Sequence, residues 1–362
     1  MLFGHGGDVY TIARQLGIRP EEVLDFSSNC SPLPYPQGFK EYLCDNIDQM
    51  HLLPEVDCAT IRQLLATRYS LDRNDFLIGS GTTQWIFGLP RILKPKRVYI
   101  AYPTYADYED ASLSEGIEVC SLGSFPNGSK EMENRLLESV DHLDDDKLTR
   151  SLVFICNPNN PTGLFIKPER LLEVINRKPD STTWIVDESY APFVDEDSFS
   201  SLLSLRCPEN VVILRSFSKI YGIPGLRVGC MVNTGIPGRR LARQMRPWAV
   251  NRMAQLALEF LLKHPEFEKD VRQICQDEKE FIVEALSRMD GFYYVEGRCH
   301  YALFSLKGGL SAQELTEALK RKGILIRNCN NFKGLQGEYI RISPRLHMDN
   351  KRLVEEIASL LE

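Results

Sequence analysis

Four short polar segments of this 362-residue chain combine residue types that bind anions and move protons. Residues 79–84 read Gly-Ser-Gly-Thr-Thr-Gln, and residues 157–163 read Asn-Pro-Asn-Asn-Pro-Thr-Gly. Residues 187–190 read Asp-Glu-Ser-Tyr, and residues 215–219 read Arg-Ser-Phe-Ser-Lys, with Arg227 eight residues after that lysine. Each segment alone has an ordinary structural explanation, such as a helix cap, a rigid turn or a solvated lysine.

Together the segments supply what one cofactor, pyridoxal 5'-phosphate, demands. It needs a lysine for its aldehyde carbon, a carboxylate for its ring nitrogen, donors to its ring hydroxyl, an aromatic stack and a phosphate cup. Small residues and hydroxyls before a helix suit the phosphate, because the helix dipole favours an anion there. The candidates, in that order, are Lys219; Asp187; Asn160 with Tyr190; Tyr105; and Ser80, Gly81, Thr82, Ser216, Ser218 and Arg227. Lys219, Asp187 and Tyr190 are the predicted catalytic residues.

Most of these segments follow a predicted strand. Apolar runs alternate with amphipathic stretches, which is typical of a mostly parallel sheet covered on both faces. Ligands of such sheets bind outside the carboxyl ends of the strands, where these polar segments would lie. The predicted strands are residues 97–101, 117–122, 152–156, 183–186, 211–214 and 228–232.

The rest of the chain predicts a second, smaller domain. A helical pattern dominates residues 239–289, and strands then mix with helices to the end of the chain. Because 362 residues exceed the usual size of one core, two domains are expected. We assign residues 1–45 to an N-terminal arm and part of the small domain, 46–245 to a large cofactor-binding domain and 246–362 to a small α+β domain. The tail strands are 292–295, 301–305 and 339–342, and its helices 311–321 and 350–361.

Composition excludes several classes of protein. Hydrophobic residues make up 43% and charged residues 25%, as in globular proteins rather than disordered or fibrous ones. The net charge is −6 with no basic block, so we expect no nucleic-acid partner. No apolar run reaches the ~18 residues of a membrane span, and no secretory signal is visible. The ten cysteines form no Cys-x-x-Cys pair. We therefore expect no metal site, and reduced thiols in a cytoplasmic protein.

The order of the motifs resembles that of fold-type I pyridoxal-phosphate enzymes of the class I and II aminotransferase superfamily. An aromatic residue, Asn-Pro-Thr-Gly elements, Asp-x-x-Tyr, Ser-x-x-Lys and an arginine eight residues after the lysine follow one another across most of residues 75–235. The resemblance implies an α/β fold, in which a large domain with a mostly parallel sheet of the seven-stranded type joins a smaller α+β domain.

A finer resemblance runs essentially end to end, to L-threonine O-3-phosphate decarboxylases of cobalamin synthesis, which are close relatives of histidinol-phosphate aminotransferases. It rests on residues 5–7, 24–29, 246–251, 324–329, 332–335 and 339–345. By this resemblance the substrate's phosphate and carboxylate would meet His5, Asn29, Asn160, Arg327, Arg341 and Arg345. Arginine suits both anions because its planar guanidinium group is permanently charged.

Two reactions stay open at this point, because the cofactor residues would serve either. The expected reaction is decarboxylation of L-threonine O-3-phosphate to (R)-1-amino-2-propanol O-2-phosphate and CO2. The alternative is an aminotransferase acting on a phosphorylated amine such as histidinol phosphate. A non-catalytic ligand-sensing relative is disfavoured, because the chain retains Lys219 and shows no helix-turn-helix segment.

The resemblance also implies a homodimer with the active site near the interface. Relatives commonly carry a Tyr-Pro whose phenol reaches the cofactor phosphate of the other subunit. Here Leu53 precedes Pro54, and leucine has no hydroxyl group. We therefore do not expect this hydrogen bond between subunits.

Overall fold

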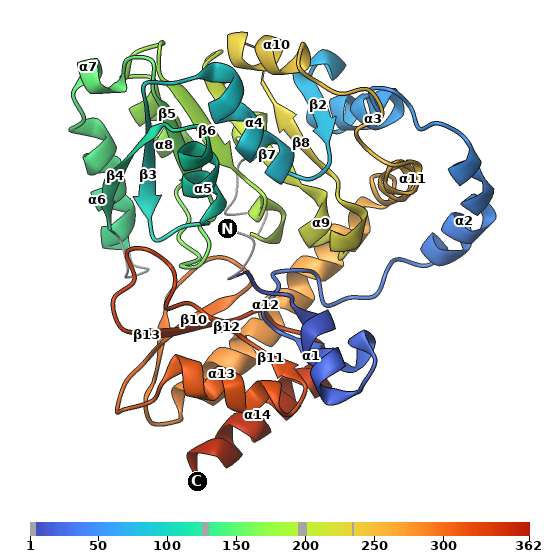
Figure 1. The fold of residues 1–362 in the computed structure, drawn as a ribbon, viewed down its shortest axis with the longest axis vertical. Coiled ribbons are helices and arrows are strands. Elements are labelled where there is room, and N and C mark those ends of the chain that lie inside the picture. The colour runs from blue at the N-terminus through green and yellow to red at the C-terminus, as the bar shows by residue number, and fades with distance from the viewer. Residues whose placement is uncertain (1–4, 125–129, 195–200, 234) are drawn as a thin grey trace.

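The larger lobe of the computed structural model is built on a seven-stranded sheet (Figure 1). The structure describes residues 5–124, 130–194, 201–233 and 235–362. The strand order is β2-β8-β7-β6-β5-β3-β4, and β8 alone runs in the direction opposite to the other six. The strands are β2 (Phe76–Gly79), β3 (Arg97–Tyr102), β4 (Glu118–Ser124), β5 (Leu152–Cys156), β6 (Thr183–Asp187), β7 (Val211–Ser216) and β8 (Gly229–Val232).

Alternate side chains of the central strands enter two apolar clusters, one on each face of the sheet. Val153 and Ile155 of β5 belong to one cluster, and Leu152 and Phe154 to the other. Burial on both faces explains why these strands are continuously apolar. The first cluster includes α3 (Ala59–Tyr69), α6 (Lys130–Asp141), α8 (Pro168–Ile175) and α11 (Arg252–Leu261), and the second α4 (Thr83–Leu93), α5 (Asp107–Ser114) and α10 (Ile236–Ala242).

The smaller lobe is a four-stranded antiparallel sheet packed against helices (Figure 1). Ile282 and Leu286, Leu315 and Leu353 come from three different helices and meet in one apolar cluster with this sheet. The strands, in sheet order, are β12 (Arg327–Asn328), β13 (Glu338–Ile342), β10 (Ala302–Leu306) and β9 (Phe292–Val295), and the helices are α12 (Pro265–Ser287), α13 (Ala312–Lys320) and α14 (His347–Leu361).

The N-terminal arm joins the smaller lobe. After α1 (Val9–Leu16), β1 (Leu24–Asp25) pairs in parallel with β11 (Ile324–Leu325). Phe26 continues the contact, because its N–H donates to the carbonyl of Leu325 at 2.8 Å and its own carbonyl accepts from Ser343 at 2.9 Å. Residues 27–29 are thereby held beside the smaller sheet. The chain then leaves through α2 (Phe39–Asp45), at one side of the molecule (Figure 1).

Helix α12 packs in both lobes. Phe267, Val271 and Cys275 belong to the core of the large sheet, whereas Ile282 and Leu286 belong to the core of the small one. The division at residue 246 stays a prediction, and this packing favours a boundary inside α12 instead.

The predicted α/β fold is confirmed. Each strand expected from the sequence is present, with its ends shifted by at most two residues. Strand β2 was not predicted, and neither were the two-residue strands β1, β11 and β12. Among the residues that the structure describes, no helix is both long enough and apolar enough to span a membrane.

Candidate active site

Two adjoining cavities lie where β3, β5, β6 and β7 end. The inner cavity has a volume of about 130 Å³ and the outer cavity about 310 Å³. Tyr105, Asn160, Tyr190 and Lys219 line both, and they follow different strands of the sheet. Strands β3, β5, β6 and β7 run in parallel, so their polar extensions meet at one edge.

The structure brings most of the predicted residues to these cavities. The inner cavity is further lined by Gly81, Thr82, Asp187, Ser216, Ser218 and Arg227, and the outer cavity by His5, Asn29, Arg327 and Arg341. The expected cofactor residues therefore surround one space, and the expected substrate residues surround the next.

Asp187 ends β6 inside the inner cavity and is buried. Tyr108 donates its hydroxyl proton to Oδ2 at 2.8 Å, and the Ser189 N–H donates to Oδ1 at 2.9 Å. Burial raises the pKa of Asp187, while the hydrogen bonds from Ser189 and Tyr108 act in the opposite direction. The two donors thus help a carboxylate to persist where water is excluded, as a partner of a protonated ring nitrogen must.

Gly81 shapes the opposite end of the inner cavity, where helix α4 begins. Its φ is +78°, and a Cβ atom there would lie 2.7 Å from Nη2 of Arg227. The left-handed backbone favours glycine, and the missing side chain lets the loop lie against this guanidinium group. With Thr82, Ser216 and Ser218 on the same lining, the loop forms a cup of hydroxyls and one cation at a helix N-terminus.

Lys219 lies in the short helix α9 (Phe217–Ile220), directly after β7. Its carbonyl accepts from the N–H of Ser31 at 2.8 Å, so the N-terminal arm also fixes this turn. The neighbouring Cys30 is the chief cause that raises the pKa of Lys219, against the opposing effect of burial. The amine can thus hold a proton at the junction of the two cavities.

A hydrogen bond between Asn29 and Tyr190 joins the N-terminal arm to the wall of the cavities. Nδ2 of Asn29 donates to the Tyr190 hydroxyl at 3.2 Å, and both side chains are buried. The Oδ1 atom of Asn29 is buried with no partner among the described residues, as is Oγ of Ser189 on the inner cavity. Two orphaned acceptors in one pair of cavities indicate that a polar ligand completes their hydrogen bonds.

Arg341 and Arg327 face the outer cavity at different depths. Arg341 is buried and donates to Oδ1 of Asn160 and, at 2.8 Å, to the carbonyl of Ser27. Arg327 is half-buried and donates to Oδ1 of Asn331 at 2.8 Å. Burial lowers the pKa of Arg327, and the charge of Arg341 adds to this effect. Neither guanidinium group is paired with a carboxylate in the described part of the chain, so both are available to an anion in the cavity.

Of the three remaining predicted residues, one lies on the outer cavity and two line neither cavity. The His5 ring lies 3.5 Å from Oδ1 of Asp107 and 5.8 Å from the Tyr105 ring, on the outer cavity. Ser80 is exposed and lines neither cavity, and its N–H donates to Gln84. Arg345 is half-buried beyond β13 and also lines neither cavity. The roles of Ser80 and Arg345 stay predictions without a contact at the site.

Sequence reasoning gave no role to Tyr108, although it holds Asp187. Tyr108 lies three residues after Tyr105, a helical spacing that could have singled it out. A buried ion pair was also missed: Nη2 of Arg215 lies 3.1 Å from Oε2 of Glu188. Because these two residues neighbour Ser216 and Asp187, the pair ties the ends of β6 and β7 together beneath the site.

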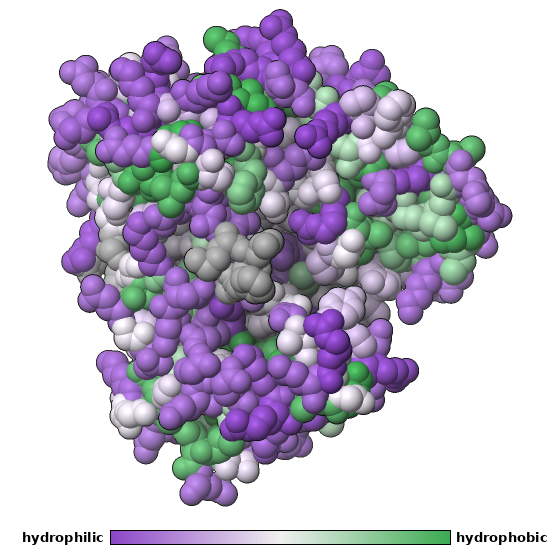
Figure 2. Space-filling model, in the orientation of Figure 1, coloured by the Kyte–Doolittle hydropathy of each residue, from purple (hydrophilic) through white to green (hydrophobic). Residues whose placement is uncertain are grey.

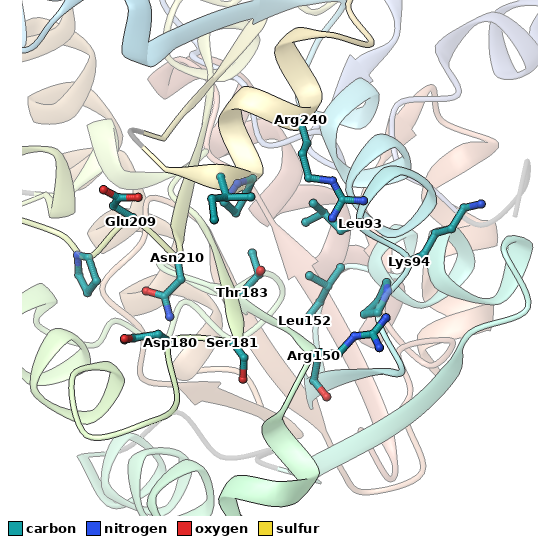
Figure 3. A pocket seen from close by; sticks show the side chains of 15 residues that line it. Leu93, Lys94, Arg150, Leu152, Asp180, Ser181, Thr183, Glu209, Asn210 and Arg240 are labelled. Atoms are coloured by element: carbon teal, nitrogen blue, oxygen red, sulfur yellow. The ribbon is translucent and has the colours of Figure 1, made fainter.

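A larger cavity, of about 720 Å³, lies at the other end of the sheet (Figure 3). It surrounds Leu152 and Thr183, which begin β5 and β6, and contains none of the predicted site residues. Lys94, Arg150 and Arg240 stand on one side of it and Asp180 and Glu209 on the other (Figure 3). Ligands of parallel sheets bind at the opposite, carboxyl end, so this cavity is not the candidate site.

Comparisons with known proteins agree with the geometry. The model of the family "Aminotransferase class I and II" matches residues 22–358. The chain belongs to this family. It is 33% identical to a threonine-phosphate decarboxylase of Salmonella typhimurium, over 99% of this chain and 96% of that one. It is also 31% identical to a histidinol-phosphate aminotransferase of Symbiobacterium thermophilum, over 98% and 95% of the two chains.

The fold of this chain is also similar to that of a solved threonine-phosphate decarboxylase. The crystal structure of L-threonine-O-3-phosphate decarboxylase from Porphyromonas gingivalis superposes with a TM-score of 0.82. The two chains are 30% identical, and the match covers 94% of this chain and 99% of that one.

Pyridoxal 5'-phosphate is the cofactor of this family, and the inner cavity fits it. The loop at Gly81 lies against the guanidinium group of Arg227, which gives the cavity a cation for the phosphate, and Oγ of Ser189 is an orphaned acceptor in the same space. Asp187 would hold the ring nitrogen, Tyr105 would stack on the ring, and Asn160 with Tyr190 would bind its hydroxyl. Lys219 would bond the aldehyde carbon.

Proposed function

We propose that this protein is a pyridoxal-phosphate-dependent carboxy-lyase that converts L-threonine O-3-phosphate to (R)-1-amino-2-propanol O-2-phosphate and CO2, a step of cobalamin biosynthesis. The observation that carries the proposal is that Arg327 and Arg341 both line the outer cavity, with no carboxylate partner among the residues that the structure describes. Threonine phosphate presents two anionic groups at once, a carboxylate and a phosphate. Histidinol phosphate presents only one. The full-length similarity to two threonine-phosphate decarboxylases supports the same choice.

The residues of the site perform three tasks in this reaction. Bound pyridoxal phosphate would supply an electron-accepting ring for the electron pair that the departing CO2 leaves at Cα. Asp187 provides the negative charge that stabilises a protonated ring nitrogen. Its carboxylate is buried and accepts hydrogen bonds from Tyr108 and Ser189. Arg341 and Arg327 hold the two anionic groups at separate points and so fix rotation about Cα. Lys219, on both cavities, holds a proton beside Cα for the product.

Replacing either arginine by alanine is expected to weaken binding of threonine phosphate by about ten- to a hundred-fold, because each charge-assisted bond is worth ~1.5–3 kcal/mol. His5→Ala and Asn29→Ala should act in the same direction. The visible spectrum of the cofactor should not change in Arg327→Ala or His5→Ala, since these two residues line only the outer cavity. The measurement is the Kd of threonine phosphate by calorimetry, with Arg97→Ala on β3 as the exposed control. Equal affinity of Arg341→Ala and wild type would contradict the substrate assignment.

The finer expectation of a homodimer is part of the proposal. Met50, Leu52, Leu53 and Val56 are 54–73% exposed, and the N–H of the half-exposed Trp248 donates to the carbonyl of Val56. Apolar residues gather on the side of the molecule that carries α2 and α11 (Figure 2). Scattered exposed apolar residues are common, but a contiguous patch of them marks an interaction surface. We infer that a second copy of the chain covers this patch. Sedimentation should give the mass of a dimer, whereas a fully active monomer would contradict this expectation.

We also propose that the protein acts in the cytoplasm. All ten of its cysteines are free in the structure, and six of them are buried among apolar residues of the cores, as reduced thiols are.

A further inference from the structure

Lys333 reaches from the smaller lobe to the larger one at the outer cavity. It lies in the loop between β12 and β13, and its Nζ is 2.6 Å from Oε1 of Glu109 in α5. The same Nζ lies 3.4 Å from the hydroxyl of Tyr102 and 4.6 Å from the centroid of its ring. Lys333, Glu109 and Tyr102 all line the outer cavity. This lysine is thus a cation of the substrate space that the mechanism above does not use.

The loop that carries Lys333 also holds Arg327. Oδ1 of Asn331 accepts from Nη2 of Arg327 at 2.8 Å, and the Phe332 ring centroid lies 5.1 Å from the guanidinium carbon. Two successive residues therefore position the arginine, and the next residue is the lysine. The loop presents both cations to the same cavity. A phosphate that met Arg327 there would lie on the side of the cavity that Lys333 lines.

The charges of the outer cavity are not all favourable to an anionic substrate. Glu109 and Asp110 also line it, and a carboxylate near a phosphate is repulsive. In the structure, the ammonium group of Lys333 offsets the negative charge of Glu109. Its side chain is 60% exposed, so the pair with Glu109 is worth little and its flexible stem can turn to another acceptor.

We propose that Lys333 is a phosphate-binding residue of the substrate site, and that Glu109 competes with the substrate for it. This inference rests on the proposed function, because it names a further group for the same substrate. A phosphate dianion attracts the ammonium group more strongly than the single charge of Glu109 does, whereas a carboxylate only matches it. The exchange therefore selects substrates that end in a phosphate over those that end in a carboxylate.

Two substitutions test the proposal with opposite expected signs. Lys333→Met removes the cation but keeps an unbranched apolar stem, and should weaken binding of inorganic phosphate and of threonine phosphate by about ten-fold. Glu109→Gln removes the competitor but keeps the shape, and should tighten the binding of both, by about two- to five-fold. Binding is measured by calorimetry on the holoenzyme. Arg97→Met and Glu118→Gln, which break an exposed ion pair of the same lobe, are the matched controls and should change nothing.

The outcomes distinguish two roles of Lys333: binding the substrate's phosphate, or only joining the two lobes through its ion pair with Glu109. If the ion pair only holds the lobes together, both substitutions break it and both weaken binding, which would overturn the proposal. Unchanged phosphate affinity in Lys333→Met would overturn it as well. Because inorganic phosphate is the probe, opposite signs would support Lys333 even if the enzyme acted on another phosphorylated amine. A failure of the proposed function appears instead in the products formed from threonine phosphate. An unchanged visible spectrum shows that each variant is folded around its cofactor.

Discussion

Lys219→Ala is expected to abolish the visible absorption that pyridoxal phosphate acquires when it is bonded to the enzyme, and to reduce turnover by at least about three orders of magnitude. Both effects follow from one amine, because Lys219 is the cation that lines both cavities among the described residues. The loss of a positioned proton donor alone costs about 10²–10⁴ in rate. Absorption spectra of the purified variant, and its mass after borohydride reduction with the cofactor, measure the first effect.

The fold should survive this substitution, because a half-buried lysine contributes little packing. Lys333→Met is the control for colour, since Lys333 lines the outer cavity only and should leave the absorption intact. A colourless wild type that cannot be reconstituted with pyridoxal phosphate would contradict the cofactor assignment for this chain.

Asp187→Asn is expected to leave the cofactor bound while lowering turnover by about 10²–10³, the usual cost of removing one buried electrostatic partner of the reacting system. The amide has the shape of the carboxylate but cannot offset the charge of a protonated ring nitrogen. Tyr108→Phe is the graded control: it removes one hydrogen bond to Asp187 and keeps the charge, so a loss of no more than about ten-fold is expected.

Steady-state turnover of the two variants, with cofactor saturation checked by absorbance, measures this difference. Near-wild-type activity of Asp187→Asn would mean that another group faces the ring nitrogen and that the end of β6 does not carry the role assigned to it.

The sequence allowed the inner cavity to be predicted because its residues lie in contiguous motifs. Asn160 and Lys219 follow predicted strands and Asp187 ends one, and parallel topology alone brings such positions together. The apolar runs of β5 and β7 were recognisable for the same physical reason, since both faces of these strands are buried.

Contacts across long stretches of chain could not be predicted in this way. Tyr108 reaches Asp187 because its ring stacks on Phe154, 4.8 Å away, and so depends on how α5 packs on the sheet. Arg341 and Asn160 are 181 residues apart in sequence, and meet only once the lobes are in place. A two-residue strand such as β1 has no periodicity, so its pairing with β11 is set by tertiary packing alone.

Arg215 and Glu188 show a different limit. Both residues were visible inside the motifs, yet a charged residue after a strand is usually solvated, and nothing in the local sequence indicates that it is buried. In the structure their side chains are 6% and 0% exposed, so each charge depends on the other.

The reaction itself is the most direct test of the account. Threonine phosphate labelled in its carboxyl carbon should be incubated with the holoenzyme, with and without 2-oxoglutarate, and the labelled CO2, the glutamate and the phosphorylated product measured together. We predict one CO2 released per substrate consumed, formation of aminopropanol phosphate, and no dependence on 2-oxoglutarate. Stoichiometric glutamate with the label retained in a 2-oxo acid would contradict the decarboxylase assignment and establish an aminotransferase in its place.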